Sequence, residues 1–136
     1  MTKSLIYFNV YGRAEPMRML LAHANVEFNE ERLVADDWPA IKASGRFVSG
    51  TLPAWQQDGQ MYFESKAILR FIGAQHGYYP SDPVQAWKAD SIVDFLHAFF
   101  PDLNNKLFAS DFGEETQKMY LENLEKVIKN FGKVMV

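Results

Sequence analysis

A tyrosine in a short apolar segment is the first residue whose type and position could support chemistry. Tyr7 lies in the run Leu5-Ile6-Tyr7-Phe8, typical of a strand covered on both faces, just before a break rich in Gly and Pro. Ligands of open α/β sheets gather outside the carboxyl ends of strands. A hydroxyl there could donate a hydrogen bond to a bound sulfur and favour the nucleophilic thiolate. From position alone, an ordinary core aromatic is the commoner interpretation.

Trp38 and Lys42 form a second candidate group, because they stand four residues apart in a short, weakly helical stretch. That spacing places both side chains on one face of a helix. A rigid indole N–H donor beside a cation would suit a ligand carboxylate. The alternative is a solvated lysine and a tryptophan that covers the sheet.

Two further positions could hold a peptide-like ligand. Leu52-Pro53 enters a predicted strand, and a cis bond there would expose the backbone of Leu52, although only about 5–6% of X–Pro bonds are cis. Glu64-Ser65 opens a predicted helix, where N–H groups attract a carboxylate and the Glu64 side chain could pair with an ammonium. The alternatives are an edge or bend at Pro53 and a plain acidic helix start.

Metal and cysteine chemistry are not expected. His23, His76 and His97 share no ligand spacing, so no metal site is predicted. The chain contains 0 cysteines, which excludes disulfide frameworks, Cys-ligated zinc and C-x-x-C redox centres. Arg13, taken alone, is a solvated turn residue.

The elements that must position these residues alternate between strands and helices in the first half of the chain. Apolar spacing and turn dipeptides such as Asp58-Gly59 predict the order β-α-β-α-β-β-α, which is that of a thioredoxin-like α/β domain. The predicted strands cover residues 5–8, 26–28, 51–55 and 60–63, and the predicted helices begin near Pro16, Trp38 and Glu64.

The second half is predicted to be all-helical. Ser81-Asp82-Pro83 offers an N-cap and a proline suited to a first helical turn. One helix is predicted from there to about Phe108, and another follows a turn around Asp111-Phe112-Gly113. The last helix carries an apolar side formed by Tyr120, Leu124, Val127, Ile128 and Phe131. We therefore predict two domains, residues 1–79 and 83–136.

Composition narrows the class of protein further. The 136 residues are 48% hydrophobic, enough for a real core, and the formal net charge is −3 with 14 scattered basic residues. No basic run suits a phosphate backbone, so nucleic acid is not an expected partner. No signal-peptide pattern opens the chain, and no apolar run approaches the ~20 residues of a membrane span. We expect a reducing, cytoplasmic setting without membrane attachment.

The order of these motifs resembles the sigma class of the glutathione transferases, which includes glutathione-dependent prostaglandin D synthases and the S-crystallins of cephalopod lenses. The match runs in register through residues 4–79 and continues more loosely through 90–94. It is carried by Leu5-Ile6-Tyr7-Phe8-Asn9, Gly12-Arg13-Ala14-Glu15, Asp37-Trp38-Pro39, Lys42, Leu52-Pro53, Asp58-Gly59 and Glu64-Ser65-x-Ala67-Ile68.

The resemblance implies an enzyme in which glutathione is the co-substrate and its thiolate attacks a small electrophile, with no metal. Tyr7 would stabilise the thiolate, Arg13 would keep it poised, and Phe8 would pack beside the site. The glycine carboxylate of glutathione would be held by Trp38 and Lys42, the cysteinyl backbone by Leu52 before a cis Pro53, and the γ-glutamyl end by Glu64 and Ser65.

Several departures from the family pattern limit this interpretation. The loop 44–51 does not align cleanly, Glu64 stands where the family usually has Gln, and His97-Ala98 replaces the paired aspartates of prostaglandin synthases. Family members are longer, so we expect a fragment whose all-α domain is incomplete. The alternative is a shortened form that oligomerises to cover its apolar side.

The resemblance also implies a homodimer, for which Phe47 and the first long helix are the places to look for the contact. The rival interpretation is a crystallin-like structural or interaction protein with little turnover.

Overall fold

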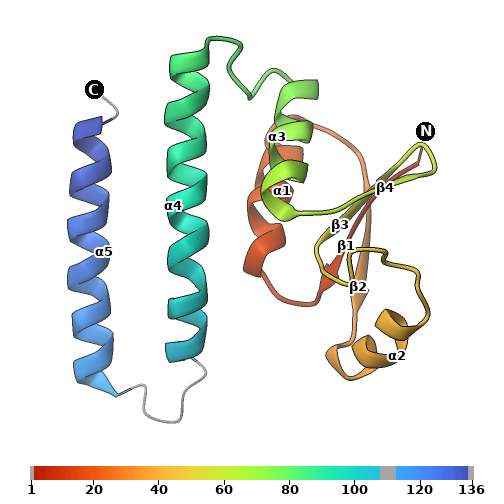
Figure 1. Cartoon of the computed structure of the whole chain (residues 1–136), viewed down its shortest axis with the longest axis horizontal. Coiled ribbons are helices and arrows are strands. Elements are labelled where there is room, and N and C mark those ends of the chain that lie inside the picture. Colours follow the sequence, from red (N-terminus) through yellow and green to blue (C-terminus); the bar gives the residue numbers. More distant parts are fainter. Residues whose placement is uncertain (1, 108–112, 135–136) are drawn as a thin grey trace. The chain divides into compact units, whose positions relative to one another are not determined.

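A computed structural model describes residues 2–107 and 113–134 and divides the chain into two compact units, Met1–Tyr79 and Pro80–Val136. Figure 1 shows the course of the chain. The elements of the first unit are β1 (Lys3–Phe8), η1 (Gly12–Ala14), α1 (Glu15–His23), β2 (Asn29–Leu33), η2 (Ala35–Asp37), α2 (Trp38–Ala43), β3 (Ala54–Gln57), β4 (Gln60–Tyr62) and α3 (Ser65–Gln75). Those of the second are α4 (Pro83–Leu107) and α5 (Glu114–Val134).

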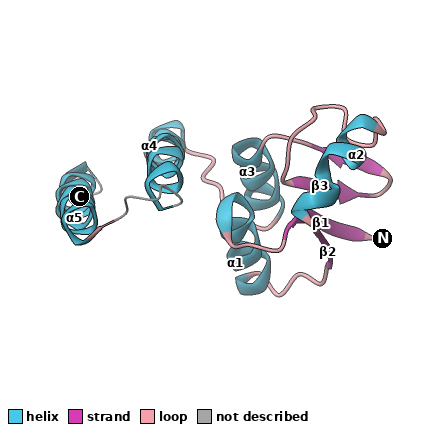
Figure 2. Cartoon of the chain, turned by 90° about the horizontal axis from the view of Figure 1, so that it is seen from below, coloured by secondary structure: helices cyan, strands magenta, loops and turns pink. Residues whose placement is uncertain are grey.

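The first unit is built on a four-stranded sheet with the strand order β2-β1-β3-β4. β1 pairs in parallel with β2 and antiparallel with β3, which in turn pairs antiparallel with β4. Helices α1 and α3 lie on one side of the sheet, and α2 lies on the other (Figure 2). The predicted thioredoxin-like α/β fold is confirmed by this arrangement.

Strand β1 is buried on both faces, as its continuous apolar run predicts. Because side chains alternate along a strand, successive residues of β1 enter different cores. Leu5 and Tyr7 join the cluster on the side of α1 and α3, where they pack with Trp55. Ile6 joins a smaller cluster on the side of α2, together with Phe47.

Helix α1 begins and ends where local residue types favour it. Pro16 occupies the first turn, where its missing N–H is no loss. Met17 and Leu21, one turn apart, are both buried against the sheet. Asn25 takes a left-handed conformation with φ 51° just after the helix, which ends the helical run.

The second strand was predicted at the wrong position. The segment 26–28, which alternates in the sequence, is a loop, and β2 covers Asn29–Leu33 instead. The strand is defined by its pairing with β1, from Ser4 opposite Asn29 to Phe8 opposite Leu33. As an edge strand, β2 carries charged side chains engaged in ion pairs, and this polar composition conceals it from a search for apolar alternation.

The second unit contains the two predicted helices, α4 and α5. The predicted helix end at Phe108, the turn residues Asp111-Phe112, and the side chains of Tyr120 and Phe131 lie outside the described residues. On α5, Leu124 and Val127 are half-buried, whereas Ile128 is exposed. Within the described ranges, no helix combines the length and the apolarity that crossing a bilayer requires.

Candidate functional site

The chain segments that carry the candidate residues lie at the end of the sheet where β1 and β2 terminate. We call this end the candidate edge. β1 and β2 run parallel and end side by side, with Phe8 opposite Leu33. β3 runs antiparallel to β1, so its first residue, Ala54, pairs with Ile6 near the same edge, and β4 ends beside the start of β3. The loop after β1, helix α2, the Leu52-Pro53 segment and the start of α3 therefore all adjoin this edge.

The Tyr7 side chain is nearly buried, with 9% of its surface exposed, and its hydroxyl lies against the loop that leads into α1. The backbone N–H of Arg13 donates a hydrogen bond to the Tyr7 hydroxyl oxygen over 3.3 Å. Gly12, at φ +43°, passes so close that a Cβ there would lie 2.8 Å from the same oxygen. A tyrosine hydroxyl that accepts from the backbone keeps its own hydrogen for donation, which suits a bound sulfur.

Phe8 and Arg13 contact Tyr7 in different ways. The rings of Tyr7 and Phe8 lie 5.6 Å apart, centroid to centroid, at an angle of 54°. The contact seen for Arg13 is made by its backbone, while its side chain is exposed. The structure thus brings Arg13 to the phenol through a main-chain donor, and the expected role of its guanidinium stays a prediction.

Trp38, at the start of α2, is tied to the site by aromatic contacts. The rings of Trp38 and Phe8 lie 5.7 Å apart, centroid to centroid, in a T-shaped arrangement at 85°, and the Trp38 ring centroid lies 5.8 Å from that of Phe47. Phe47 is 2% exposed, and the Arg46 guanidinium carbon lies 4.9 Å from its ring centroid. Phe47 is therefore a core residue beneath Trp38 and offers little surface for the subunit contact that the sequence suggested.

Lys42 lies on α2 one turn after Trp38 and is exposed. Its stem crosses Gly50, where an added Cβ would lie 3.0 Å from the Lys42 Cε. Gly50 adopts φ +61°, a conformation that favours glycine. This close approach brings the Lys42 side chain beside the loop that leads into Leu52-Pro53.

The Leu52–Pro53 peptide bond is cis. Pro53 is fully buried, and the half-buried Leu52 packs against both cores of the first unit. The paired part of β3 begins at Ala54, so the backbone of Leu52 lies beyond the ladder, at the candidate edge. Its pairing with a peptide-like ligand stays a prediction.

Glu64, immediately before α3, has an unusual backbone conformation. Its φ of +67° is rare for a residue with a side chain, and strained backbone of this kind is concentrated at functional sites. Glu64 is exposed and its side chain makes no capping hydrogen bond, while its carbonyl oxygen accepts one from the Ile68 N–H over 2.9 Å. Ser65, the first helical residue, is buried.

Two residues at this edge, Asn9 and Arg32, were not assigned to the site from the sequence. A hollow of about 380 Å³ and a second of about 280 Å³ lie here, and Asn9, Val10 and Arg32 line both. Arg32 donates a hydrogen bond to the Asn9 side-chain oxygen over 2.6 Å. Arg32 belongs to β2, and the misplaced second strand gave no reason to put it at this edge.

Ion pairs hold the two glutamates of β2 in their charged form. Burial acts to raise the pKa of Glu30, but hydrogen bonds from Arg32 and Arg18 outweigh it and hold the pKa below its ordinary value of 4.5. Both terminal nitrogens of Arg46 donate to Glu31 over 2.6 Å, and these bonds lower the pKa of Glu31. Both carboxylates are therefore charged at neutral pH.

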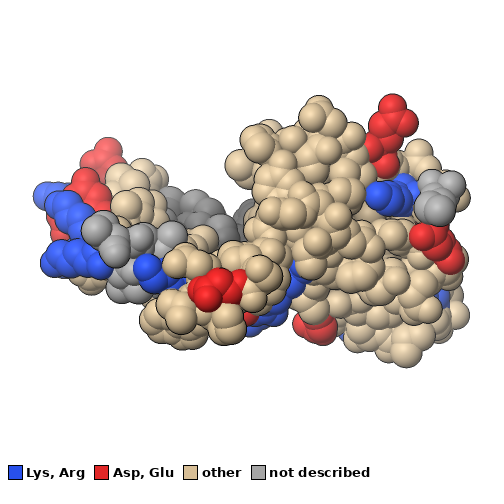
Figure 3. All heavy atoms as spheres, turned by 90° about the horizontal axis from the view of Figure 1, so that it is seen from above, with Lys and Arg blue, Asp and Glu red and all other residues tan. Residues whose placement is uncertain are grey.

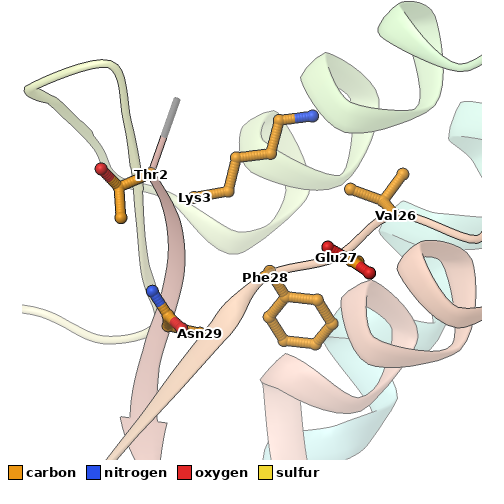
Figure 4. A pocket seen from close by; sticks show the side chains of 6 residues that line it. All are labelled: Thr2, Lys3, Val26, Glu27, Phe28 and Asn29. Carbon is orange, nitrogen blue, oxygen red and sulfur yellow. The ribbon is translucent and has the colours of Figure 1, made fainter.

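A larger hollow of about 550 Å³ lies at the opposite edge of the sheet, where β1 and β2 begin (Figure 4). It is lined by Thr2, Lys3, Val26, Glu27, Phe28 and Asn29. The length of β1 separates Lys3 from the Tyr7 end, and none of the candidate residues lines this hollow. Its size alone does not make it the candidate site, because the candidate residues converge at the other edge.

Charged side chains of both signs are interspersed on the face drawn in Figure 3. Among residues 2–107 and 113–134, no three His, Asp or Glu side chains gather in a way that could hold a metal ion. The candidate edge itself carries a phenol, an indole, a lysine, a glutamate with positive φ and backbone groups.

The fold is that of a thioredoxin-like domain, and comparison with known proteins identifies its family. Residues 3–74 match the family described as glutathione S-transferase, N-terminal domain. The chain therefore belongs to the glutathione S-transferases.

Relatives agree with this assignment. The chain is 36% identical over 99 residues to glutathione S-transferase 1 of Ascaris suum, covering 73% of this chain and 47% of that protein. It is 39% identical over 95 residues to hematopoietic prostaglandin D synthase of Gallus gallus, covering 70% and 47%.

A solved structure, the monomeric glutathione S-transferase of the human hookworm Necator americanus, aligns with a TM-score of 0.70 and 32% identity, covering 84% of this chain and 55% of that one. The chain spans about half the length of the curated relatives it matches.

Proposed function

We propose that this chain binds glutathione at the described edge and activates its thiol through Tyr7, as part of a transferase that joins glutathione to a small electrophile. The observation that carries the proposal is the convergence of four chain segments at one sheet edge, with a tyrosine hydroxyl free to donate its hydrogen there. Family membership supports glutathione as the ligand.

The parts of the tripeptide match the residues along this edge. Trp38 and Lys42 would hold the glycine carboxylate through an indole N–H and an ammonium. The backbone of Leu52, before Pro53, would pair with the cysteinyl residue. At the γ-glutamyl end, the exposed carboxylate of Glu64 would meet the ligand ammonium, and Ser65 with the first N–H groups of α3 would receive its carboxylate.

The chemical step needs a thiolate, and Tyr7 supplies the means to form it. A hydrogen bond donated to sulfur favours the charged form and lowers the pKa of the bound thiol. The thiolate then forms a carbon–sulfur bond with the electrophile, whose leaving group departs with its electron pair. Arg13 contributes its backbone N–H to the position of the phenol.

The class and setting of the protein belong to the same proposal. The order of the motifs and the prostaglandin D synthase relative support the sigma class. We also propose a detoxifying role in the cytoplasm. We infer that residues 1–79 form the glutathione-binding domain and that 83–136 correspond to the first two helices of an all-helical domain. The proposed assembly is a homodimer, although a related hookworm enzyme is monomeric.

Tyr7→Phe tests the activation step, because it removes the hydroxyl and keeps the ring. We expect conjugation of glutathione to a generic aryl halide to fall about 100-fold, the typical effect of losing one donor to a developing anion. Glutathione affinity, measured by isothermal titration, should change little. Unchanged conjugation in the variant, or no binding to the parent chain at millimolar glutathione, contradicts the proposal.

A second candidate function is supported by the exposed apolar side chains of the helical unit. On α4 and α5, Trp87, Met119, Leu121 and Ile128 are each more than half exposed. Such side chains suit a structural or protein-interaction role on a transferase scaffold. Glutathione binding without measurable conjugation by the parent chain would favour this role over the enzymatic one.

A further inference from the structure

The loop between β1 and α1 holds the groups that touch Tyr7, yet it has few apolar contacts of its own. Val10 is 54% exposed and Tyr11 is 79% exposed, so neither side chain anchors the loop in the core. The next two residues, Gly12 and Arg13, are those that lie against the Tyr7 hydroxyl. Polar bonds must therefore determine where this loop lies.

Arg18 of α1 supplies those bonds. Its Nη1 atom donates to the carbonyl oxygens of Val10 and Tyr11, over 3.1 and 3.2 Å. The guanidinium is in turn oriented by two carboxylates, Glu15 at 2.8 Å on its own helix and Glu30 on β2. The Arg18 side chain is only 12% exposed.

The Arg18 guanidinium bonds the loop but leaves one of its own nitrogens without a hydrogen-bond partner among the described residues. The Nη2 atom of Arg18 is buried and has no hydrogen-bond partner within the described part of the chain. A buried unpaired donor is unfavourable, so the other bonds must hold the group in place. Glu30 also accepts from Arg32, which binds the Asn9 side chain, so the same network reaches the start of the loop.

We propose that Arg18 is a positioning residue of the thiol site, which holds the β1–α1 loop against Tyr7 and so sets the direction in which the hydroxyl donates its hydrogen. Arg18 does not touch the thiol; it acts through Val10, Tyr11 and the two residues that follow. The proposal rests on the function proposed above, because it assigns Arg18 a part in thiol activation.

Arg18→Lys is the sharpest test. Lysine keeps the positive charge beside Glu15 and Glu30, but it lacks the planar guanidinium that also bonds the two carbonyl oxygens of the loop. We expect the pKa of bound glutathione, followed by thiolate absorbance against pH, to rise by about one unit. Conjugation below that pKa would fall about tenfold, since the thiolate fraction falls tenfold per unit. Glutathione affinity should change less than threefold.

The matched control is Glu15→Gln, which removes one ion pair of Arg18 and leaves both carbonyl bonds in place. It should leave the pKa of the bound thiol where it is in the parent chain. A thiol pKa that is equal in Arg18→Lys and the parent overturns the proposal, even if the variant unfolds at lower urea concentration, because Arg18 would then be purely structural.

A readout without ligand separates this proposal from the proposed function. In the ligand-free chain, Arg18→Lys should shift the amide resonances of Gly12 and Arg13 and the ring resonances of Tyr7, whereas Glu15→Gln should not. Unmoved resonances refute the positioning role whether or not glutathione binds. Failure of the parent chain to bind glutathione refutes the proposed function and the thiol part of this proposal, and moved resonances would then support only the effect on the loop.

Discussion

The two sides of the candidate edge are held in place by different forces. On the side of α1, Tyr7 accepts a backbone hydrogen bond and lies close to Gly12, and Arg18 donates hydrogen bonds to the β1–α1 loop that carries both contacts. On the side of α2, Trp38 rests on a buried phenylalanine within a row of aromatic rings. Under the proposed function, activation of the thiol would depend on directional polar geometry, whereas the α2 side, which would hold the ligand's glycine end, is positioned by apolar packing.

This difference predicts which property each substitution changes. Polar contacts lose their effect when a donor moves by a fraction of an ångström, with small loss of stability. When a buried apolar side chain is shortened, the free energy of unfolding falls with the volume of the cavity left behind. Variants that change only polar contacts on the α1 side should mainly change the reactivity of the thiol, and variants on the α2 side should mainly change stability and affinity.

The largest expected effect is that of Phe47→Ala, which empties the space beneath Trp38. Loss of a fully buried phenylalanine costs about 3–5 kcal/mol in the free energy of unfolding. Urea denaturation followed by tryptophan fluorescence measures it. The control is Val48→Ala at the next position, which is 90% exposed and should change stability by less than about 0.5 kcal/mol. Equal effects in the two variants contradict the packing role of Phe47.

Gly12→Ala should have the second-largest effect, because the substitution introduces both backbone strain and a steric clash. Its φ of +43° disfavours a side chain, and the new Cβ would lie 2.8 Å from the Tyr7 hydroxyl. We expect a loss of about 1–3 kcal/mol in stability, together with reduced conjugation. Gly45→Ala, at φ +76° with nothing within 4 Å, carries the backbone cost without the collision. Conjugation that falls equally in both variants shows that the contact with Tyr7 is unimportant.

Lys42→Met tests the binding role of the α2 side. We expect the dissociation constant of glutathione to rise about tenfold, equivalent to about 1.4 kcal/mol, while the pKa of the bound thiol stays unchanged. Isothermal titration and thiolate absorbance measure the two quantities. Lys3→Met, at the opposite edge of the sheet, is the charge-matched control and should bind as the parent does. A shifted thiol pKa in Lys42→Met would break the division between the two sides.

The smallest expected effect concerns the ion pair of Glu31 with Arg46, in which both side chains are 40% exposed. The pKa of Glu31 is lowered from its ordinary 4.5 by the hydrogen bonds from Arg46, so the pair stabilises the fold above that value. This contribution disappears as the pH falls through the lowered pKa.

We expect Glu31→Gln to cost about 0.5 kcal/mol at pH 7, as exposed pairs do. The difference from the parent should vanish in acid. A difference in urea stability that persists unchanged in acid would show that it does not come from the charge.

Much of the fold followed from local patterns. The apolar run of β1, the helical spacing of Met17 and Leu21, and the Asp58-Gly59 turn each lie where the structure has the predicted element. Such signals are local, because a strand covered on both faces, an amphipathic helix and a two-residue turn each need particular residue types at short range. No local signal determines the position of β2. Its pairing with β1 determines where the strand lies, and its own residues are mostly polar.

The candidate site divides in the same way. The sequence by itself determined which side chains could act, since the order of motifs from Tyr7 to Ser65 predicted a site for glutathione. Only the tertiary structure showed that Gly12 and the Arg13 N–H contact the phenol. It also showed that Phe47 is buried beneath Trp38 and that Arg18 donates hydrogen bonds to the β1–α1 loop. These facts depend on backbone conformation and on contacts between distant segments, which residue types and spacing do not encode.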